Sequence, residues 1–241
     1  MAKASETGHA KNISNFDVLI TTCEGYGVAY NPTKAAIKVV NLKVQYTAAL
    51  ASNTLYATKS RTNNDDKNDR KAGFQPVKKL ATRLLNALKA TDASDDTVAD
   101  AEGFQRKIQG ERAESKPKPT IPPSPDNSHS VAQQSYTNMV EHLKGLNLVL
   151  STESTYAPNE NELTTATIAI LVTNLTTLNK NESVSFIAMD NSKIDRNAKL
   201  YGVKTGILDT EQEVKDYVKS VYGSTSPQYK QLTKLKFKDS R

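Results

Sequence analysis

The sequence predicts an all-α protein in which two tandem, sequence-related up-down helical bundles are joined by a proline-rich linker. Apolar residues recur every three or four positions, for example at Ile37, Val40 and Val44, which is the period of a helix with one apolar face. Glycine and proline are absent from 33–72 and from 159–201, so the turns that a β protein needs within such lengths are missing. A third observation, an internal repeat, predicts two copies of one helical unit.

The internal repeat relates positions that are 126 residues apart. Residues 30–78 align with 156–204 without a gap. Further along the chain the separation falls to 113 residues, so the first copy carries about thirteen extra residues around 84–90. We therefore interpret 13–112 and 133–241 as two copies of one bundle.

Each copy is expected to contain a short leading helix, a long helix, a return helix and a short closing helix. The apolar spacing predicts the leading helices at 14–23 and 131–150. Between the copies, 113–132 contains five prolines within nine residues, a composition that interrupts helices and favours an extended spacer. Residues 1–12 are polar and are expected to form a flexible N-terminal arm.

Signals that end helices agree with this order of elements. Pro76 and Gly202 occupy aligned positions and predict that the return helix, expected to include Phe74 and 80–88 in the first copy, is interrupted or bent at the same place in both copies. Gly110 and Gly223 stand where the closing helices are expected to end, since glycine adopts the backbone conformation found just after a helix.

Composition and charge exclude several classes of protein. The 241-residue chain has a net charge of +6, which is moderately basic. A single cysteine, Cys23, excludes an internal disulfide and has no histidine near it in the sequence. The three histidines lack the spacing of metal ligands, and no nucleotide-binding motif is present. We therefore predict that the protein is not an enzyme, with no catalytic residue, no cofactor and no metal.

The sequence also bears on location. No uncharged apolar stretch reaches the roughly 20 residues that a membrane span needs. The first nine residues are polar and lack the apolar core of a secretory signal. A cytoplasmic location without a membrane span is therefore expected.

Two groups of basic residues are candidate contacts for a nucleic acid or another polyanion, because lysine and arginine neutralise phosphates. No recognition motif accompanies them, and a solvated surface is the favoured interpretation. The candidate residues are Lys78, Lys79, Arg83, Lys230, Lys234, Lys236, Lys238 and Arg241.

A repeated Asp-Arg pair is the most visible polar element that the two copies share. It occurs at Asp69-Arg70 and again at Asp195-Arg196. A structural ion pair or helix cap is the favoured interpretation, and an anion site in each copy is the alternative.

Short motifs across most of the chain carry a family resemblance. They are Gly8-His9-Ala10-Lys11-Asn12, Gly25-Tyr26-Gly27, Tyr30-Asn31-Pro32, Asn86-Ala87-Leu88-Lys89-Ala90-Thr91 and Ser226-Pro227-Gln228-Tyr229-Lys230. With these motifs the chain resembles an uncharacterised bacterial family of duplicated helical proteins. No activity, ligand or catalytic residue is known for that family, so the resemblance adds no function.

The expected function is that of a non-enzymatic structural or interaction protein, either a scaffold or a protein that self-associates. Its partner would then be another protein or a second copy of the chain. The alternative is an accessory protein that binds nucleic acid or another polyanion through the basic residues. A third hypothesis is a bundle that stores an apolar ligand, and a buried pocket lined by Thr164, Thr167 and Ile170 would favour it.

Overall fold

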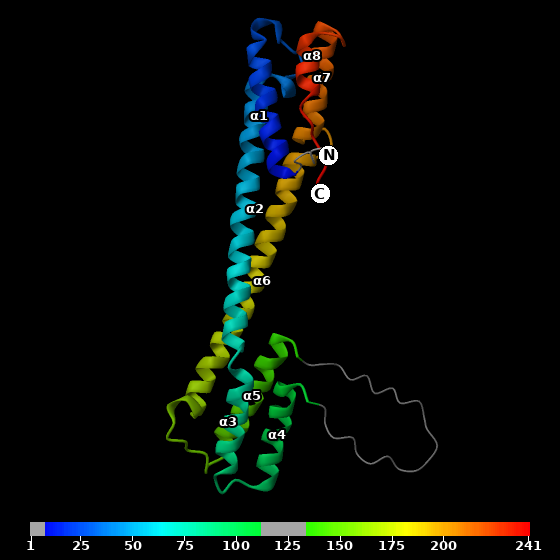
Figure 1. The fold of residues 1–241 in the computed structure, drawn as a ribbon. Helices are drawn as coiled ribbons and strands as arrows, with labels where there is room; N and C mark the ends of the chain where they lie inside the picture. The colour runs from blue at the N-terminus through cyan, green and yellow to red at the C-terminus, as the bar shows by residue number, and fades with distance from the viewer. Residues whose placement is uncertain (1–7, 112–133) are drawn as a thin grey trace, which may run out of the picture. The chain divides into compact units, whose positions relative to one another are not determined.

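The computed structural model describes residues 8–111 and 134–241, and every regular element in these two ranges is helical. The first range forms α1 (His9–Gly25), α2 (Val39–Phe74), α3 (Val77–Lys89) and α4 (Asp95–Gln109). The second forms α5 (Tyr136–Thr152), α6 (Thr165–Tyr201), α7 (Ile207–Tyr222) and α8 (Pro227–Thr233) (Figure 1). The predicted all-α class is confirmed. None of the described helices is long and apolar enough to span a membrane.

The ends of the predicted segments need correction. The predicted flexible arm, 1–12, extends too far, because α1 already begins at His9. Asn12 is buried in that helix, where its side chain is hydrogen-bonded to the backbone of Lys238. The second leading helix, predicted at 131–150, begins at Tyr136, where Ser135 caps the helix by accepting a hydrogen bond from the backbone of Asn138. The predicted linker, 113–132, lies outside the described residues.

The chain folds into two compact units that do not follow the predicted bundle boundaries of 13–112 and 133–241. Unit 1 comprises Met1–Asn63 with Ser185–Arg241, and unit 2 comprises Asn64–Val184. Each unit therefore contains helices from both halves of the sequence. The physical reason is the length of α2 and α6, which have no break within them and contribute residues to both units.

Unit 1 has its core between α1, α7, the beginning of α2 and the end of α6. Leucine and aromatic side chains of α1 pack against valines of α7, and α8 closes the unit against α7. Tyr56 of α2 lies against Arg196 of α6, which shows that the two long helices are neighbours inside this unit. The fully buried side chains of this core include Phe16, Leu19, Leu42, Val214, Val218 and Leu232.

Unit 2 has its core between α3, α4 and α5, with the end of α2 and the beginning of α6 packed beside them. Helices α4 and α5 approach closely because Gly145 of α5 lies against the ring of Phe104. The fully buried side chains of this core include Leu84, Leu88, Ile108, Leu143, Leu146 and Ile168.

Each long helix is preceded by the same tyrosine-closed turn. The hydroxyl of Tyr30 donates to the carbonyl of Ile37 at 2.7 Å, and the hydroxyl of Tyr156 donates to that of Leu163 at 2.8 Å. A short 3₁₀ turn follows in each case, at Ala35–Ile37 and at Asn161–Leu163. The two tyrosines, and likewise the two 3₁₀ turns, are 126 positions apart, so the sequence alignment pairs them.

The interruption expected within the return helix lies instead at the end of each long helix, and Phe74 belongs to α2. Helix α2 ends at Phe74 beside Pro76, and α6 ends at Tyr201 beside Gly202. The extra residues predicted in the first copy belong to α3, whereas α6 is followed directly by the turn that leads into α7. Gly110 is the C-cap of α4, where its left-handed backbone, at φ 84°, suits glycine.

Candidate functional site

An uncharged, solvent-exposed face runs along the part of α2 that belongs to unit 1. Its residues recur every three or four positions, which places them on one side of the helix. Val40 and Val44 are 66% and 64% exposed, and Leu55 is 45% exposed. We name this face the α2 stripe; it consists of Val40, Val44, Thr47, Ala51, Leu55, Thr58 and Thr62.

The structure shows which way the apolar period of α2 faces. The period through Ile37, Val40 and Val44 identified a helix, and such a period ordinarily marks the face that a helix buries. In the structure Ile37 precedes α2 and is buried, whereas the valines point to solvent. The face that α2 turns to the core of unit 1 is a separate one; it includes Val39, Leu42, Tyr46, Ala49, Ser52 and Asn63.

A matching face lies on the part of α6 that belongs to unit 2. Each of its residues is 126 positions after a member of the α2 stripe, and all are exposed. Ile170, the counterpart of Val44, is 62% exposed. We name this face the α6 stripe; it consists of Ala166, Ile170, Thr173, Thr177, Asn181 and Val184.

Arg70 and Arg196 contact side chains other than the aspartates next to them in the sequence. Arg70 donates a hydrogen bond to Glu182 at 2.6 Å, and its guanidinium carbon lies 4.7 Å from the centre of the Tyr136 ring. Asp69 is exposed, because adjacent residues of a helix point in different directions. The pairing partner of Arg70 is therefore a glutamate of α6, and its role in unit 2 is to link helices.

Arg196 occupies the aligned position in unit 1 and is 5% exposed. Its guanidinium stacks on Tyr56, with 4.2 Å between the guanidinium carbon and the ring centre, and donates to the side chain of Asn197. The carboxylate of Asp195 lies 4.0 Å from the ammonium of Lys199. Both arginines thus lie against an aromatic ring within their own unit.

The basic candidates on α3 are partly neutralised within unit 2. Arg83 forms an ion pair with Glu162, and the ammonium of Lys78 donates to the carbonyl of Gln109 at 3.1 Å. Lys79 is exposed. The five remaining candidates all lie in unit 1 and are all exposed; they are Lys230, Lys234, Lys236, Lys238 and Arg241.

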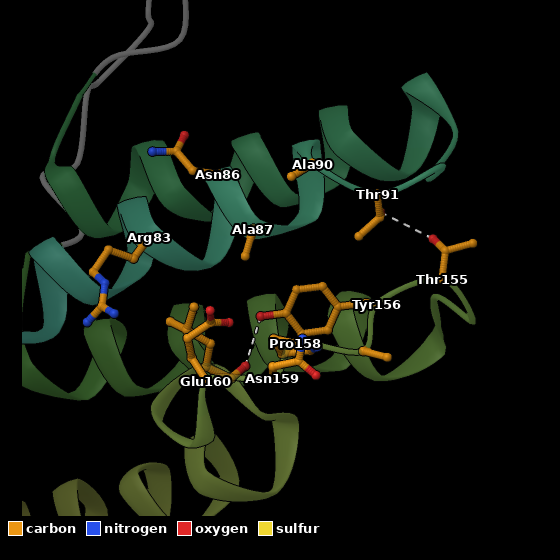
Figure 2. Close-up of a pocket in the computed structure, with 12 residues that line it drawn as sticks. Arg83, Asn86, Ala87, Ala90, Thr91, Thr155, Tyr156, Pro158, Asn159 and Glu160 are labelled. Atoms are coloured by element: carbon orange, nitrogen blue, oxygen red, sulfur yellow. Dashed lines mark hydrogen bonds between the residues drawn. The ribbon is translucent and has the colours of Figure 1, made fainter.

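A hollow of about 540 Å³ lies between α3 and the loop that precedes α6 (Figure 2). Arg83 and Asn86 line it from the helix, and Tyr156 and Glu160 line it from the loop. The hydroxyl of Tyr156 is engaged by the carbonyl of Leu163, and Arg83 is paired with Glu162. Two of the polar side chains that line the hollow are therefore engaged within unit 2.

A second hollow in unit 2, of about 420 Å³, bears on the hypothesis of a stored apolar ligand. Thr167, Ile168 and Ile170 line it, together with Arg83 and Glu162. Because Ile170 is 62% exposed, this space is an open groove. It is not the buried pocket that storage of an apolar ligand requires.

Metal and thiol chemistry are not supported by the described residues. No group of three or more histidine, cysteine or carboxylate side chains in them could hold a metal ion. His9 is hydrogen-bonded to Tyr201, and His142 is 9% exposed in α5. Burial raises the pKa of the Cys23 thiol to about 12, which keeps it protonated and unreactive. The third histidine, His129, lies outside the described residues.

No protein-family model, no curated protein and no solved structure matches the chain. The exposed apolar side chains of the two stripes are therefore the features of the chain that point most directly to a function.

Proposed function

We propose that this protein is a non-enzymatic structural protein that self-associates through the α2 stripe and the α6 stripe. The observation that carries the proposal is the exposure of Val40, Val44 and Leu55 along one face of α2, at 66%, 64% and 45%. A helix that serves only its own unit is expected to expose mainly polar and charged residues. The exposed valines are therefore explained best by a partner that covers them.

The stripes have the composition of a helix-docking surface. Charged residues are absent from all the positions of both stripes, and depletion of charge is typical of the centre of an interface. Valine, isoleucine and leucine supply apolar area, and each such side chain contributes about 1.5–3 kcal/mol when fully buried. The alanines and threonines between them are small and allow another helix to approach.

A second copy of the chain is the proposed partner. We propose that the two halves arose by duplication, which the gap-free alignment and the two tyrosine-closed turns support. Duplication explains why Val44 and its counterpart Ile170 are exposed to nearly the same extent. Each chain then presents two like surfaces, so one molecule can bind two neighbours and contacts can propagate into an assembly.

The test is light scattering of the full chain at tens of micromolar protein. We expect an assembled wild type, and we expect the double variant Val44→Glu with Ile170→Glu to be monomeric, because each stripe then carries a charge that its partner would bury. The matched control introduces the same charges at Ala57 and Ser183, which are also exposed, lie outside the stripes and are 126 positions apart. A monomeric wild type, or equal loss of assembly in the control, would show that the proposal is wrong.

A further inference from the structure

The C-terminal segment of unit 1 follows α8, is rich in lysine and is held against α1. The side-chain amide of Asn12 donates to the carbonyl of Lys238 at 2.7 Å and accepts from its backbone N–H at 3.1 Å. Asn15, one turn later on α1, donates to the carbonyl of Lys236 at 2.7 Å. These three hydrogen bonds fix the backbone of the segment.

The side chains of this segment alternate between the core and solvent. Leu235 and Phe237 pack against the core of unit 1. Lys234, Lys236 and Lys238 are exposed. Lys236 and Lys238 alternate with Leu235 and Phe237, which places both lysines on the solvent side, and the exposed Lys234, the C-cap of α8, comes directly before them. The result is a row of ammonium groups on a fixed backbone.

The positive charge of this row is not compensated. In the described part of the chain, no ion pair involves Lys234, Lys236, Lys238 or Lys230, which lies one helical turn before Lys234. Asp239 is the one acidic residue of 227–241, and it is engaged by Arg241 at 2.6 Å. We name these four lysines the lysine ridge.

We propose that the lysine ridge binds the phosphate backbone of double-stranded nucleic acid without reading its sequence. This inference goes beyond the proposed self-association and does not depend on it. A row of unpaired ammonium groups neutralises phosphates and releases their counterions, which is the source of sequence-independent binding. The apolar side chains of the segment are turned inward, so it offers neither an anchor for a lipid surface nor a stacking platform for single-stranded bases.

The experiment measures binding of the full chain to a short DNA duplex of mixed sequence over a series of salt concentrations. Replacing Lys234, Lys236 and Lys238 by glutamine should weaken binding and reduce the slope of log affinity against log salt by about 2.7, since each phosphate contact contributes about 0.9. The matched control replaces the exposed Lys71, Lys144 and Lys180 of unit 2 by glutamine, which lowers the net charge equally. The control should keep the wild-type slope.

A second variant tests the ordered backbone separately from the charge. Asn12→Ala with Asn15→Ala keeps all four lysines but removes the hydrogen bonds that fix the segment, and it should weaken binding several-fold in a chain that circular dichroism shows to be folded. The proposal is overturned if the wild type does not bind the duplex at low salt, or if the ridge variant and the control lose the same slope. Binding to vesicles of phosphatidylcholine and phosphatidylserine without binding to the duplex would also overturn it.

Discussion

Arg70 of α2 and Glu182 of α6 are joined by a 2.6 Å hydrogen bond between Nη1 and Oε2, beneath the ring of Tyr136 from α5. The two side chains are only 21% and 13% exposed. Three helices of unit 2 therefore meet at one charge-assisted contact. Because the pair is partly buried, removing either side chain leaves the other charge without its partner and destabilises the fold.

Replacing Arg70 by alanine should lower the free energy of unfolding by about 2 kcal/mol, because a charge-assisted bond and a stacked cation are lost together. Thermal unfolding followed by circular dichroism measures the effect. The control is Asp69→Asn, which changes the neighbouring exposed carboxylate and should alter stability by less than about 0.5 kcal/mol. An equal loss in the two variants would mean that Asp69, and not Glu182, is the relevant partner.

The two tyrosine-closed turns give a matched pair of substitutions. Tyr30→Phe and Tyr156→Phe each delete the hydroxyl that donates to a buried carbonyl, at Ile37 and Leu163 respectively. Each should cost about 1 kcal/mol, and the two costs should be similar because the local geometry is the same. Chemical denaturation of the single variants provides the measurement. A large effect at one tyrosine and none at the other would contradict the equivalence of the turns.

The approach of α4 to α5 depends on the absence of a side chain at Gly145. A Cβ at this position would lie 2.3 Å from Cε1 of Phe104. Gly145→Ala should therefore destabilise the protein by about 1–3 kcal/mol through overpacking. Gly103, in α4, has nothing within 4 Å of an added Cβ, so Gly103→Ala should stabilise by about 0.5–1 kcal/mol through helix propensity. Stabilisation by both substitutions would show that α4 and α5 are not in close contact at Gly145.

Cys23 is a reporter of the folding of unit 1. Its thiol is fully buried, and burial raises its pKa to about 12. At about pH 8 an alkylating reagent should react with the thiol much more slowly in the native chain than in denaturant, since the thiolate is the reactive form. The shift also favours the folded state below the ordinary pKa of 9.0, and this contribution is lost as the pH rises through about 12. Rapid labelling of the native chain would contradict the buried position.

The helical class and several helix ends follow from local features that the sequence displays directly. Missing glycine and proline allow α2 and α6 to run without a break, and Pro76 stops α2 because it cannot donate the next backbone hydrogen bond. Gly110 ends α4 because it adopts a left-handed conformation at low cost. Propensity and capping act over a few residues, and for that reason they can be predicted without knowledge of the fold.

The candidate surfaces were only partly visible in the sequence. Val44 belongs to the apolar period that identifies α2, but the period does not say whether that side faces the core or solvent. The sequence shows that the C-terminal segment is rich in basic residues, but it does not show how they are arranged. Their arrangement in an exposed row depends on hydrogen bonds from Asn12 and Asn15, more than 200 positions earlier in the chain.

The sequence by itself determined where helices form. Only the tertiary structure decided how the helices are combined, so that α1 packs with α7 in unit 1 and α4 packs with α5 in unit 2. It also decided that Glu182 is the partner of Arg70 and that Val44 faces solvent. Helix formation depends on neighbours within one or two turns, whereas burial and pairing depend on side chains that meet only after distant segments pack together.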